Sequence, residues 1–170
     1  IKPIPQSLGI EDKVILKCRE MQKKCRVLVV DDEAIYFKFM EALLLKSAEL
    51  ANCVEFYFAL DSKEAVSIAR TDEPQLIFCD LNLGQKSTNG FSVIEELREI
   101  GNKSVICVHS NSLIKCDREQ ALIVGANSFL PKPMTYEQFV QALLDAVESA
   151  AFVKEDLPEI SVIDDEMTYR

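Results

Sequence analysis

Residues 26–33 read Arg-Val-Leu-Val-Val-Asp-Asp-Glu, and this stretch decides the fold. Its apolar run is continuous and rich in valine, which is typical of a strand buried on both faces of a parallel sheet. Three carboxylates follow the run directly. The stretch therefore predicts a central strand over 26–30 with charged side chains at its carboxyl end.

The same strand–helix unit recurs along the chain. Further apolar runs predict strands at 53–59, 76–79, 105–108 and 128–130. Stretches with helical spacing of apolar residues follow each strand, at 34–50, 61–69, 91–100, 114–122 and 135–147. Asp61 with Glu64, and Thr135 with Gln138, have the spacing of capping boxes that begin helices. Five such units predict an α/β fold, a doubly wound five-stranded parallel sheet with helices on both faces.

Length and charge limit the class of protein. The chain has 170 residues, of which 48% are hydrophobic, and a net charge of -9. This length predicts one globular domain with a short appendage. The acidic balance argues against nucleic-acid binding and against adhesion to anionic membranes. No apolar run approaches the ~20 residues of a spanning helix and no secretory signal is recognisable, so we expect a cytoplasmic protein without a membrane partner.

The cysteines predict core thiols rather than a metal or redox site. There are six of them, none in a C-x-x-C pair, and His109 is the single histidine. A zinc site needs about four clustered ligands, which this spacing does not offer. In a reducing compartment we expect the cysteines to pack as small apolar residues and His109 to be structural.

Changes in charge and pattern divide the chain into three parts. Residues 1–24 carry six Lys or Arg against three Asp or Glu, whereas residues 151–170 carry two against six. Residues at helical spacing predict an extra N-terminal helix, namely Ile10, Val14, Cys18 and Met21. This helix either packs on its own domain or pairs two chains in a homodimer. We expect a domain over 25–150, followed by an acidic tail or linker, or the start of an output domain.

Polar residues gather at one edge of the predicted sheet. They follow the first, third, fourth and fifth strands and comprise Asp31, Asp32, Asp80, Ser110 and Lys132. Carboxylates placed together repel each other unless one is protonated or a cation binds, and their hard oxygens suit Mg²⁺. Glycine-rich nucleotide loops are absent from the sequence. The chemistry that fits is phosphoryl transfer from a donor onto Asp80, with the Lys132 ammonium beside a phosphoryl oxygen.

Four segments, in order, carry a resemblance to a known family. They are VLVVDDE at 27–33, IFCDLNL at 77–83, VHS at 108–110 and FLPKP at 129–133. The set resembles the receiver domain of two-component response regulators, over about 25–150. The resemblance implies a flavodoxin-like fold and phosphorylation of an aspartate by a histidine kinase or a histidine phosphotransfer protein.

The resemblance also implies how the acceptor and a metal are held. Asp80 matches the phosphoacceptor, and Asp31 and Asp32 match the acidic pair that holds Mg²⁺ directly or through water. Asn82 would give its backbone carbonyl to the metal.

Three further positions match the residues that respond to phosphorylation. Ser110 matches the hydroxyl residue that senses the phosphoryl group, Lys132 matches the lysine of the family, and Phe129 matches the aromatic switch position. Two features depart from the family pattern: the loop after Asp80 is long and holds Gly84 where proline is frequent, and Asn111 replaces a small residue. We expect these departures to change the lifetime of the phosphoryl group.

The expected function is a phosphorylation-gated switch and not an enzyme that turns over a substrate. Two alternatives are a small hydrolase of the aspartyl-phosphate type and an unphosphorylated interaction scaffold. Such hydrolases carry D-x-D at the nucleophile, whereas this chain has Asp80-Leu81-Asn82 and lacks the second carboxylate.

Overall fold

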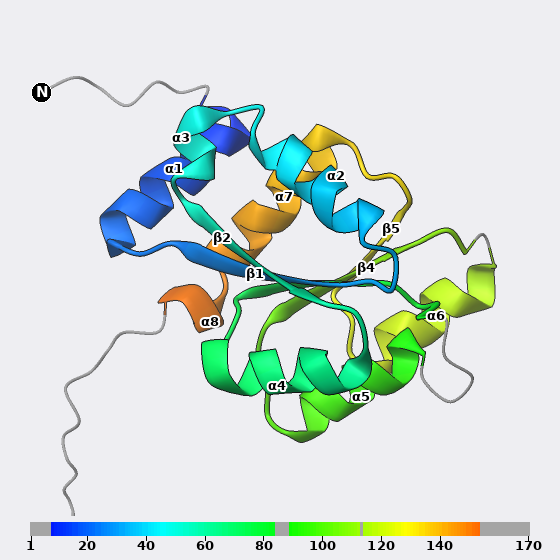
Figure 1. Ribbon diagram of the computed structural model, residues 1–170. Coiled ribbons are helices and arrows are strands. Elements are labelled where there is room, and N and C mark those ends of the chain that lie inside the picture. The colour runs from blue at the N-terminus through cyan, green and yellow to red at the C-terminus, as the bar shows by residue number, and fades with distance from the viewer. Residues whose placement is uncertain (1–7, 84–88, 113, 154–170) are drawn as a thin grey trace, which may run out of the picture.

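In the computed structural model, which describes residues 8–83, 89–112 and 114–153, a parallel sheet separates two layers of helices (Figure 1). The strand order is β2-β1-β3-β4-β5. The strands are β1 (Cys25–Val30), β2 (Val54–Ala59), β3 (Leu76–Cys79), β4 (Val105–Ser110) and β5 (Ser128–Pro131). Every neighbouring pair is parallel, which confirms the predicted five-stranded sheet.

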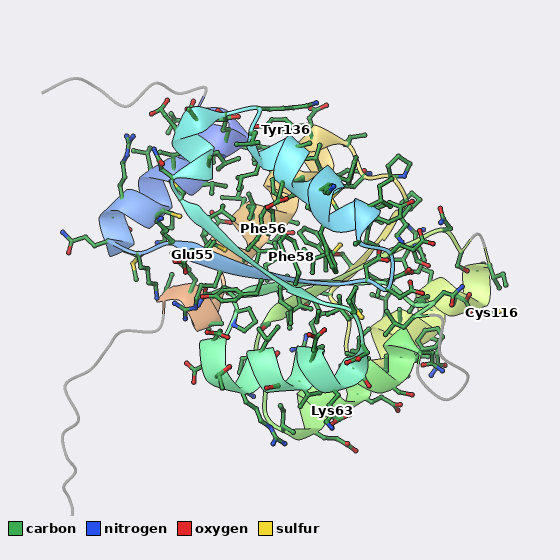
Figure 2. The ribbon with its side chains drawn as sticks, viewed as in Figure 1. Glu55, Phe56, Phe58, Lys63, Cys116 and Tyr136 are labelled. Carbon is green, nitrogen blue, oxygen red and sulfur yellow. The ribbon has the colours of Figure 1, made fainter. Side chains whose placement is uncertain are left out.

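The helices cover both faces, as a doubly wound sheet requires (Figure 1). One face carries α1 (Ile10–Met21), α2 (Ile35–Leu44), α3 (Ala48–Ala51) and α7 (Tyr136–Val147). The other carries α4 (Ser62–Asp72), α5 (Gly90–Glu99) and α6 (Lys115–Val124), and the short α8 (Ala150–Val153) follows α7. Each face has its own apolar core, and Phe56 and Phe58 of β2 pack into the first of them (Figure 2).

The register of the central strands places the acidic residues side by side. Val30 of β1 lies opposite Cys79 of β3, so the next residue of each strand leaves the sheet at the same point. These next residues are Asp31 and Asp80. Both strands are almost fully buried because helices cover both faces, which is why they read as continuous apolar runs.

One predicted helix is wrong in its extent. We expected a single helix over 34–50, but the structure has α2, a break, and then α3. Ser47 lies in the break with extended backbone, and its side chain accepts a hydrogen bond from the Leu50 N–H. Serine competes for backbone N–H groups and therefore favours the beginning of a new helix.

The apolar stripe expected for α6 is also wrong in part. The helix begins at Lys115, and Ala121 is its buried apolar residue. Ile114, Leu122 and Ile123 are 60%, 48% and 76% exposed. Spacing alone does not tell which side of a helix faces the sheet, and here three large apolar residues face outward.

The two predicted capping boxes differ in the structure. Before α7, Thr135 and Gln138 make both hydrogen bonds of the box. Before α4, Asp61 accepts from the Glu64 N–H, but the Glu64 carboxylate accepts from the N–H of Leu60. Both helices begin where the sequence predicted.

The N-terminal helix α1 packs against α7 of the same chain. Its buried residues, Val14, Ile15 and Cys18, belong to the core of that face. The Tyr136 hydroxyl at the start of α7 donates a hydrogen bond to the Glu11 carboxylate of α1. The apolar side of α1 is therefore used within the chain, and a homodimer through this helix would have to use its outward side, where Leu16 is 47% exposed.

All six cysteines, which lie within the described residues, are free thiols. Five are buried, as expected, but Cys116 is exposed on α6, so the prediction that all are core is wrong there (Figure 2). Among the helices of the described residues, none has the length and apolar composition needed to cross a membrane.

Candidate functional site

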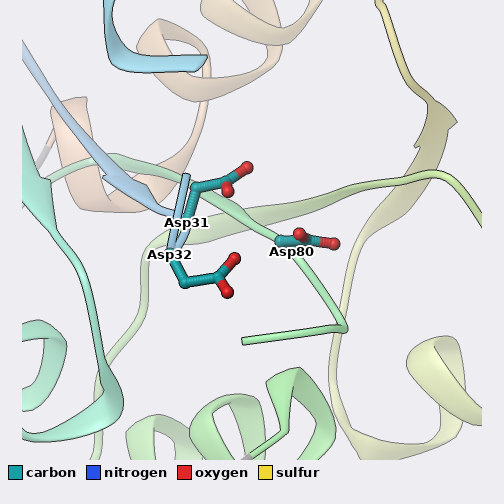
Figure 3. A group of neighbouring side chains, drawn as sticks. All are labelled: Asp31, Asp32 and Asp80. Carbon is teal, nitrogen blue, oxygen red and sulfur yellow. The ribbon is translucent and has the colours of Figure 1, made fainter. Parts of the chain in front are cut away.

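Three carboxylates lie together at the carboxyl ends of β1 and β3 (Figure 3). Oxygen atoms of Asp31, Asp32 and Asp80 all lie within 4.8 Å of one another. Asp31 and Asp80 are 2% and 5% exposed, whereas Asp32 is exposed. The group is therefore open to solvent on the side of Asp32.

The backbone holds the two buried carboxylates in the same way. The N–H of Asp31 donates to the Ala59 carbonyl at 3.0 Å, and the N–H of Asp80 donates to the Val30 carbonyl at 3.0 Å. In each case one carboxylate oxygen then accepts an N–H from two residues further on. Glu33 N–H donates to Asp31 Oδ1 at 2.9 Å, and Asn82 N–H donates to Asp80 Oδ1 at 3.3 Å. These turns direct the other oxygen of each side chain toward the centre of the group.

Lys132 bridges the two buried carboxylates. Its Nζ lies 2.7 Å from Asp31 Oδ2 and 3.0 Å from Asp80 Oδ2, and its side chain is 2% exposed. Burial favours the neutral amine, but the hydrogen bonds to Asp31 and Asp80 outweigh it and raise the pKa of Lys132. The ammonium therefore stays charged between Asp31 and Asp80.

One ammonium does not neutralise three carboxylates. Burial raises the pKa of Asp31 and the nearby Asp80 charge adds to that effect, although Lys132 and the Glu33 N–H oppose it. Burial and the Asp80 charge thus act against ionisation of Asp31, and a further cation beside it would offset them. All three carboxylates offer hard oxygen atoms, and the exposed Asp32 leaves room for water, so the residues fit a hard divalent cation such as Mg²⁺.

The structure brings Ser110 next to Lys132 along the sheet. Ser110 is 2% exposed and ends β4, and its carbonyl accepts the Lys132 N–H at 3.0 Å. Its hydroxyl accepts the N–H of Ser112 at 3.3 Å, within its own loop. Phe129 is half-buried on β5, with the Arg118 guanidinium 5.7 Å from the centre of its ring.

The loop after Asp80 is described at both ends. Asn82 pairs with Asn89 in an antiparallel bridge, so the loop returns close to its origin. Residues 84–88, which include Gly84, lie outside the described residues. Asn111 is exposed directly after Ser110.

Two residues that sequence reasoning missed contact this site. Gly90 begins α5, and a Cβ atom there would lie 2.3 Å from the Asp80 carbonyl oxygen, so this position requires glycine. Tyr36 places its ring over Lys132, with 3.7 Å between Nζ and the ring centre. The position of Gly90 at the end of the loop after Asp80 could have indicated a close approach of the backbone. Nothing in the sequence indicates the contact between Tyr36 and Lys132.

Comparisons with known proteins agree with this geometry. The family model of the response regulator receiver domain matches residues 27–144. The transcriptional regulatory protein PrrA of Mycobacterium bovis is 34% identical over 116 residues, which cover 68% of this chain and 46% of PrrA. The nitrate/nitrite response regulator protein NarL of Escherichia coli is 27% identical over 139 residues, which cover 82% of this chain and 62% of NarL. The chain spans about half the length of the curated relatives it matches.

Solved structures show the same architecture. The receiver domain of the response regulator NarL from Mycobacterium tuberculosis has a TM-score of 0.63 at 23% identity, and the match covers 74% of this chain and 98% of that one. A response regulator from Burkholderia pseudomallei, solved with a phosphorylated aspartic acid, a calcium ion and citrate, has a TM-score of 0.61 at 25% identity, covering 74% and 70%. The match of the family model over more than half of the chain, on a sheet with an acidic carboxyl edge, shows that the chain belongs to the response regulator receiver domain family.

Proposed function

We propose that Asp80 accepts a phosphoryl group from a histidine kinase or a histidine phosphotransfer protein in a Mg²⁺-dependent reaction. The observation that carries this proposal is the Lys132 ammonium held between two buried carboxylates, 2.7 Å from Asp31 and 3.0 Å from Asp80. The Burkholderia relative, which carries a phosphorylated aspartic acid and a calcium ion, supports it.

The transfer forms one bond and breaks another. A carboxylate oxygen of Asp80 attacks phosphorus and forms an O–P bond, while the P–N bond of the phosphohistidine donor breaks. The electron pair leaves with the donor nitrogen, which takes a proton from water. Such a step asks the protein mainly for positioning and charge neutralisation, and Lys132 supplies a positive charge at the acceptor.

Asp31, Asp32 and Asp80, with the backbone carbonyl of Asn82, would hold Mg²⁺. When bound, the ion neutralises charge on the phosphoryl oxygens. This chain's own residues prepare the site for it, since two of the three carboxylates are buried and fixed by backbone N–H groups.

Phosphorylation would then shift a conformational equilibrium. The Ser110 hydroxyl would leave the Ser112 N–H for a phosphoryl oxygen, and Phe129 would turn further into the core. Contacts with the phosphoryl group would be made in only one of the two conformations. They would supply the difference in free energy that shifts the population toward that conformation. The face formed by α6, β5 and α7 would change, and the exposed apolar residues of α6 described above suit it to an output partner.

We propose that the protein is a cytoplasmic switch and not an enzyme that turns over a substrate. At the position of the second hydrolase carboxylate stands Asn82, whose N–H donates to Asp80. An amide cannot act as the general acid or base of a hydrolase.

The test is phosphoryl uptake. The protein is incubated with Mg²⁺ and acetyl phosphate, and its intact mass is measured before and after mild base. We expect one base-labile phosphoryl group on the wild type and on the control Asp145→Asn, an exposed aspartate of α7, and none on Asp80→Asn. If the folded wild type takes up no phosphoryl group, the interaction scaffold is the alternative that remains. Rapid hydrolysis of acetyl phosphate would favour the hydrolase. Labelling of Asp80→Asn would show that another residue is the acceptor.

A further inference from the structure

Lys132 is contacted by an aromatic ring as well as by carboxylates. Tyr36 lies in the first turn of α2, three residues after Glu33 of the acidic loop. The Lys132 Nζ lies 3.7 Å from the centre of its ring, within the range in which the negative face of a ring attracts a cation. The ammonium therefore has Asp31, Asp80 and the Tyr36 ring as its partners.

His109 of β4 contacts the Tyr36 ring. The two rings meet edge to face, with 5.8 Å between their centres and an interplanar angle of 86°. Phe39, one turn further along α2, stacks on His109 at 6.3 Å. His109 is 2% exposed, so these contacts fix the orientation of both rings.

The same histidine fixes the backbone that carries Lys132. His109 Nε2 accepts the N–H of Met134 at 3.1 Å, two residues after Lys132. An acceptor nitrogen carries no proton, so this bond requires a neutral imidazole. Burial and the nearby Lys132 charge lower the pKa of His109 to about 4, which keeps it neutral at physiological pH. One buried side chain thus positions both the ring over the ammonium and the chain that bears it.

The ring has a role that the carboxylates do not. When a cation and a phosphoryl group take over the oxygens of Asp31 and Asp80, the ion pairs of Lys132 weaken, whereas the ring stays where it is. We propose that Tyr36 and His109 are positioning residues that keep the Lys132 ammonium at the acceptor, ready for an incoming phosphoryl oxygen. This inference rests on the proposed function of Asp80 as acceptor.

The first test compares Tyr36→Leu, which removes the ring, with Tyr36→Phe, which keeps it. Phe37→Leu is the matched control, since Phe37 is the next residue of α2, is also half-buried, and stacks on Phe58 at 4.6 Å. At saturating acetyl phosphate we expect Tyr36→Leu to be phosphorylated about tenfold more slowly, with Tyr36→Phe and Phe37→Leu near the wild-type rate. Calorimetry should give the same Mg²⁺ affinity for all four proteins.

A second measurement reports the contact without any phosphorylation. Protons on the Lys132 Cε over the ring face should resonate upfield in NMR spectra of the wild type and of Tyr36→Phe, and return to ordinary shifts in Tyr36→Leu. His109→Gln, which keeps an acceptor but no ring, should be phosphorylated faster than His109→Leu, which keeps neither. Unfolding midpoints in urea are measured for each variant so that rates are compared on folded protein.

The outcomes separate the two proposals. A wild-type rate for Tyr36→Leu, equal slowing of Tyr36→Leu and Phe37→Leu, or an ordinary Lys132 shift in the wild type would each overturn the positioning role. If the wild type takes up no phosphoryl group, the proposed function fails, and the Lys132 shift and its loss in Tyr36→Leu decide the positioning of the ammonium by themselves.

Discussion

Two buried or half-buried cations sit at opposite ends of the sheet, and they are held by different chemistry. At the carboxyl end, Lys132 is bound to the carboxylates of Asp31 and Asp80. At the amino ends of β4 and β5, the Arg98 guanidinium donates five hydrogen bonds of 2.8–3.0 Å to uncharged oxygens. These are the carbonyls of Gly125, Asn102 and Ser104 and the side-chain Oδ1 of Asn127.

The comparison distinguishes a cation with a structural role, Arg98, from a cation whose partners can be exchanged, Lys132. The rigid planar guanidinium of Arg98 donates to four oxygens, none of which belongs to an ionisable group. Lys132 has charged partners, which a metal ion and a phosphoryl group would take over under the proposed function. Hydrogen bonds to uncharged oxygens therefore hold the cation at the amino end of the sheet. At the carboxyl end ion pairs hold the cation, and a bound cation or anion would change them.

The largest effect is expected from Lys132→Ala. It leaves Asp31 and Asp80 buried without their cation, which costs about 3 kcal/mol of the free energy of unfolding. It also removes the positive charge beside Asp80, the proposed acceptor, so phosphorylation should slow by about 100-fold. Urea unfolding with and without Mg²⁺ checks the comparison, because the divalent ion should restore much of the lost stability. An equal loss of stability with Mg²⁺ present would contradict it.

Arg98→Met should lower the free energy of unfolding by as much as Lys132→Ala does, without changing the acidic site. Removing the guanidinium orphans several oxygens that are partly buried, at a cost of about 3 kcal/mol in total. We expect no recovery with Mg²⁺ and an unchanged phosphorylation rate for the folded fraction. A rate that falls together with stability would show that the two ends of the sheet are not separable.

The two ends should also differ in their response to pH. Burial and Lys132 lower the pKa of His109 from 6.5 to about 4, so between these values the unfolded chain binds more protons than the folded one. Stability should therefore fall as the pH falls through this window, by about 3 kcal/mol in all. Urea unfolding at several pH values should show a weaker dependence for His109→Gln. Arg98→Met should keep the wild-type slope, and an unchanged slope in His109→Gln would contradict the assignment.

Two glycines sharpen the comparison further. In Gly90→Ala the new Cβ would meet the Asp80 backbone at 2.3 Å, and in Gly125→Ala it would meet the Arg98 side chain at 2.8 Å with φ at +123°. Each should lower stability by about 2 kcal/mol. Phosphorylation should slow several-fold in Gly90→Ala alone, and an equal effect of both on the rate would argue against a local cause.

The smallest effect is expected from Asn111→Ala. Asn111 is exposed beside Ser110, so stability should stay within about 0.5 kcal/mol of the wild type. The half-life of phosphorylated Asp80, followed by intact mass after removal of the donor, should change by a few-fold because an amide beside the phosphoryl group affects access of water. Identical half-lives would show that this departure from the family pattern has no kinetic role.

Much of the carboxyl end was predictable because topology alone brings it together. Parallel strands end at one edge, so residues that follow the strands converge without any knowledge of side-chain packing. This is why Asp31, Asp80 and Lys132 could be grouped from the sequence. The Tyr36 ring could not, since its place over Lys132 depends on the rotation of α2 and on its contact with His109.

The errors in the fold have local and tertiary causes. Ser47 begins a new helix where periodicity continued the old one, because a side-chain hydrogen bond to Leu50 competes with the helical one. The side of α6 that faces outward was misjudged, since Leu122 of the predicted stripe and the adjacent Ile123 are exposed. Periodicity reports an apolar side, but it does not report whether that side is buried in the domain.

The hydrophobic core includes residues beyond both ends of the family match. Val14 of α1 and Phe152 of α8, each 0% exposed, belong to the same core as Met40 and Phe139. We therefore expect α1 and α8 to unfold together with the sheet, so that a ligand of the acidic edge would stabilise α1 as well. A chain trimmed to 27–144 would expose apolar surface of α7 that α1 covers, so we expect the unit that folds cooperatively to be wider than the family match.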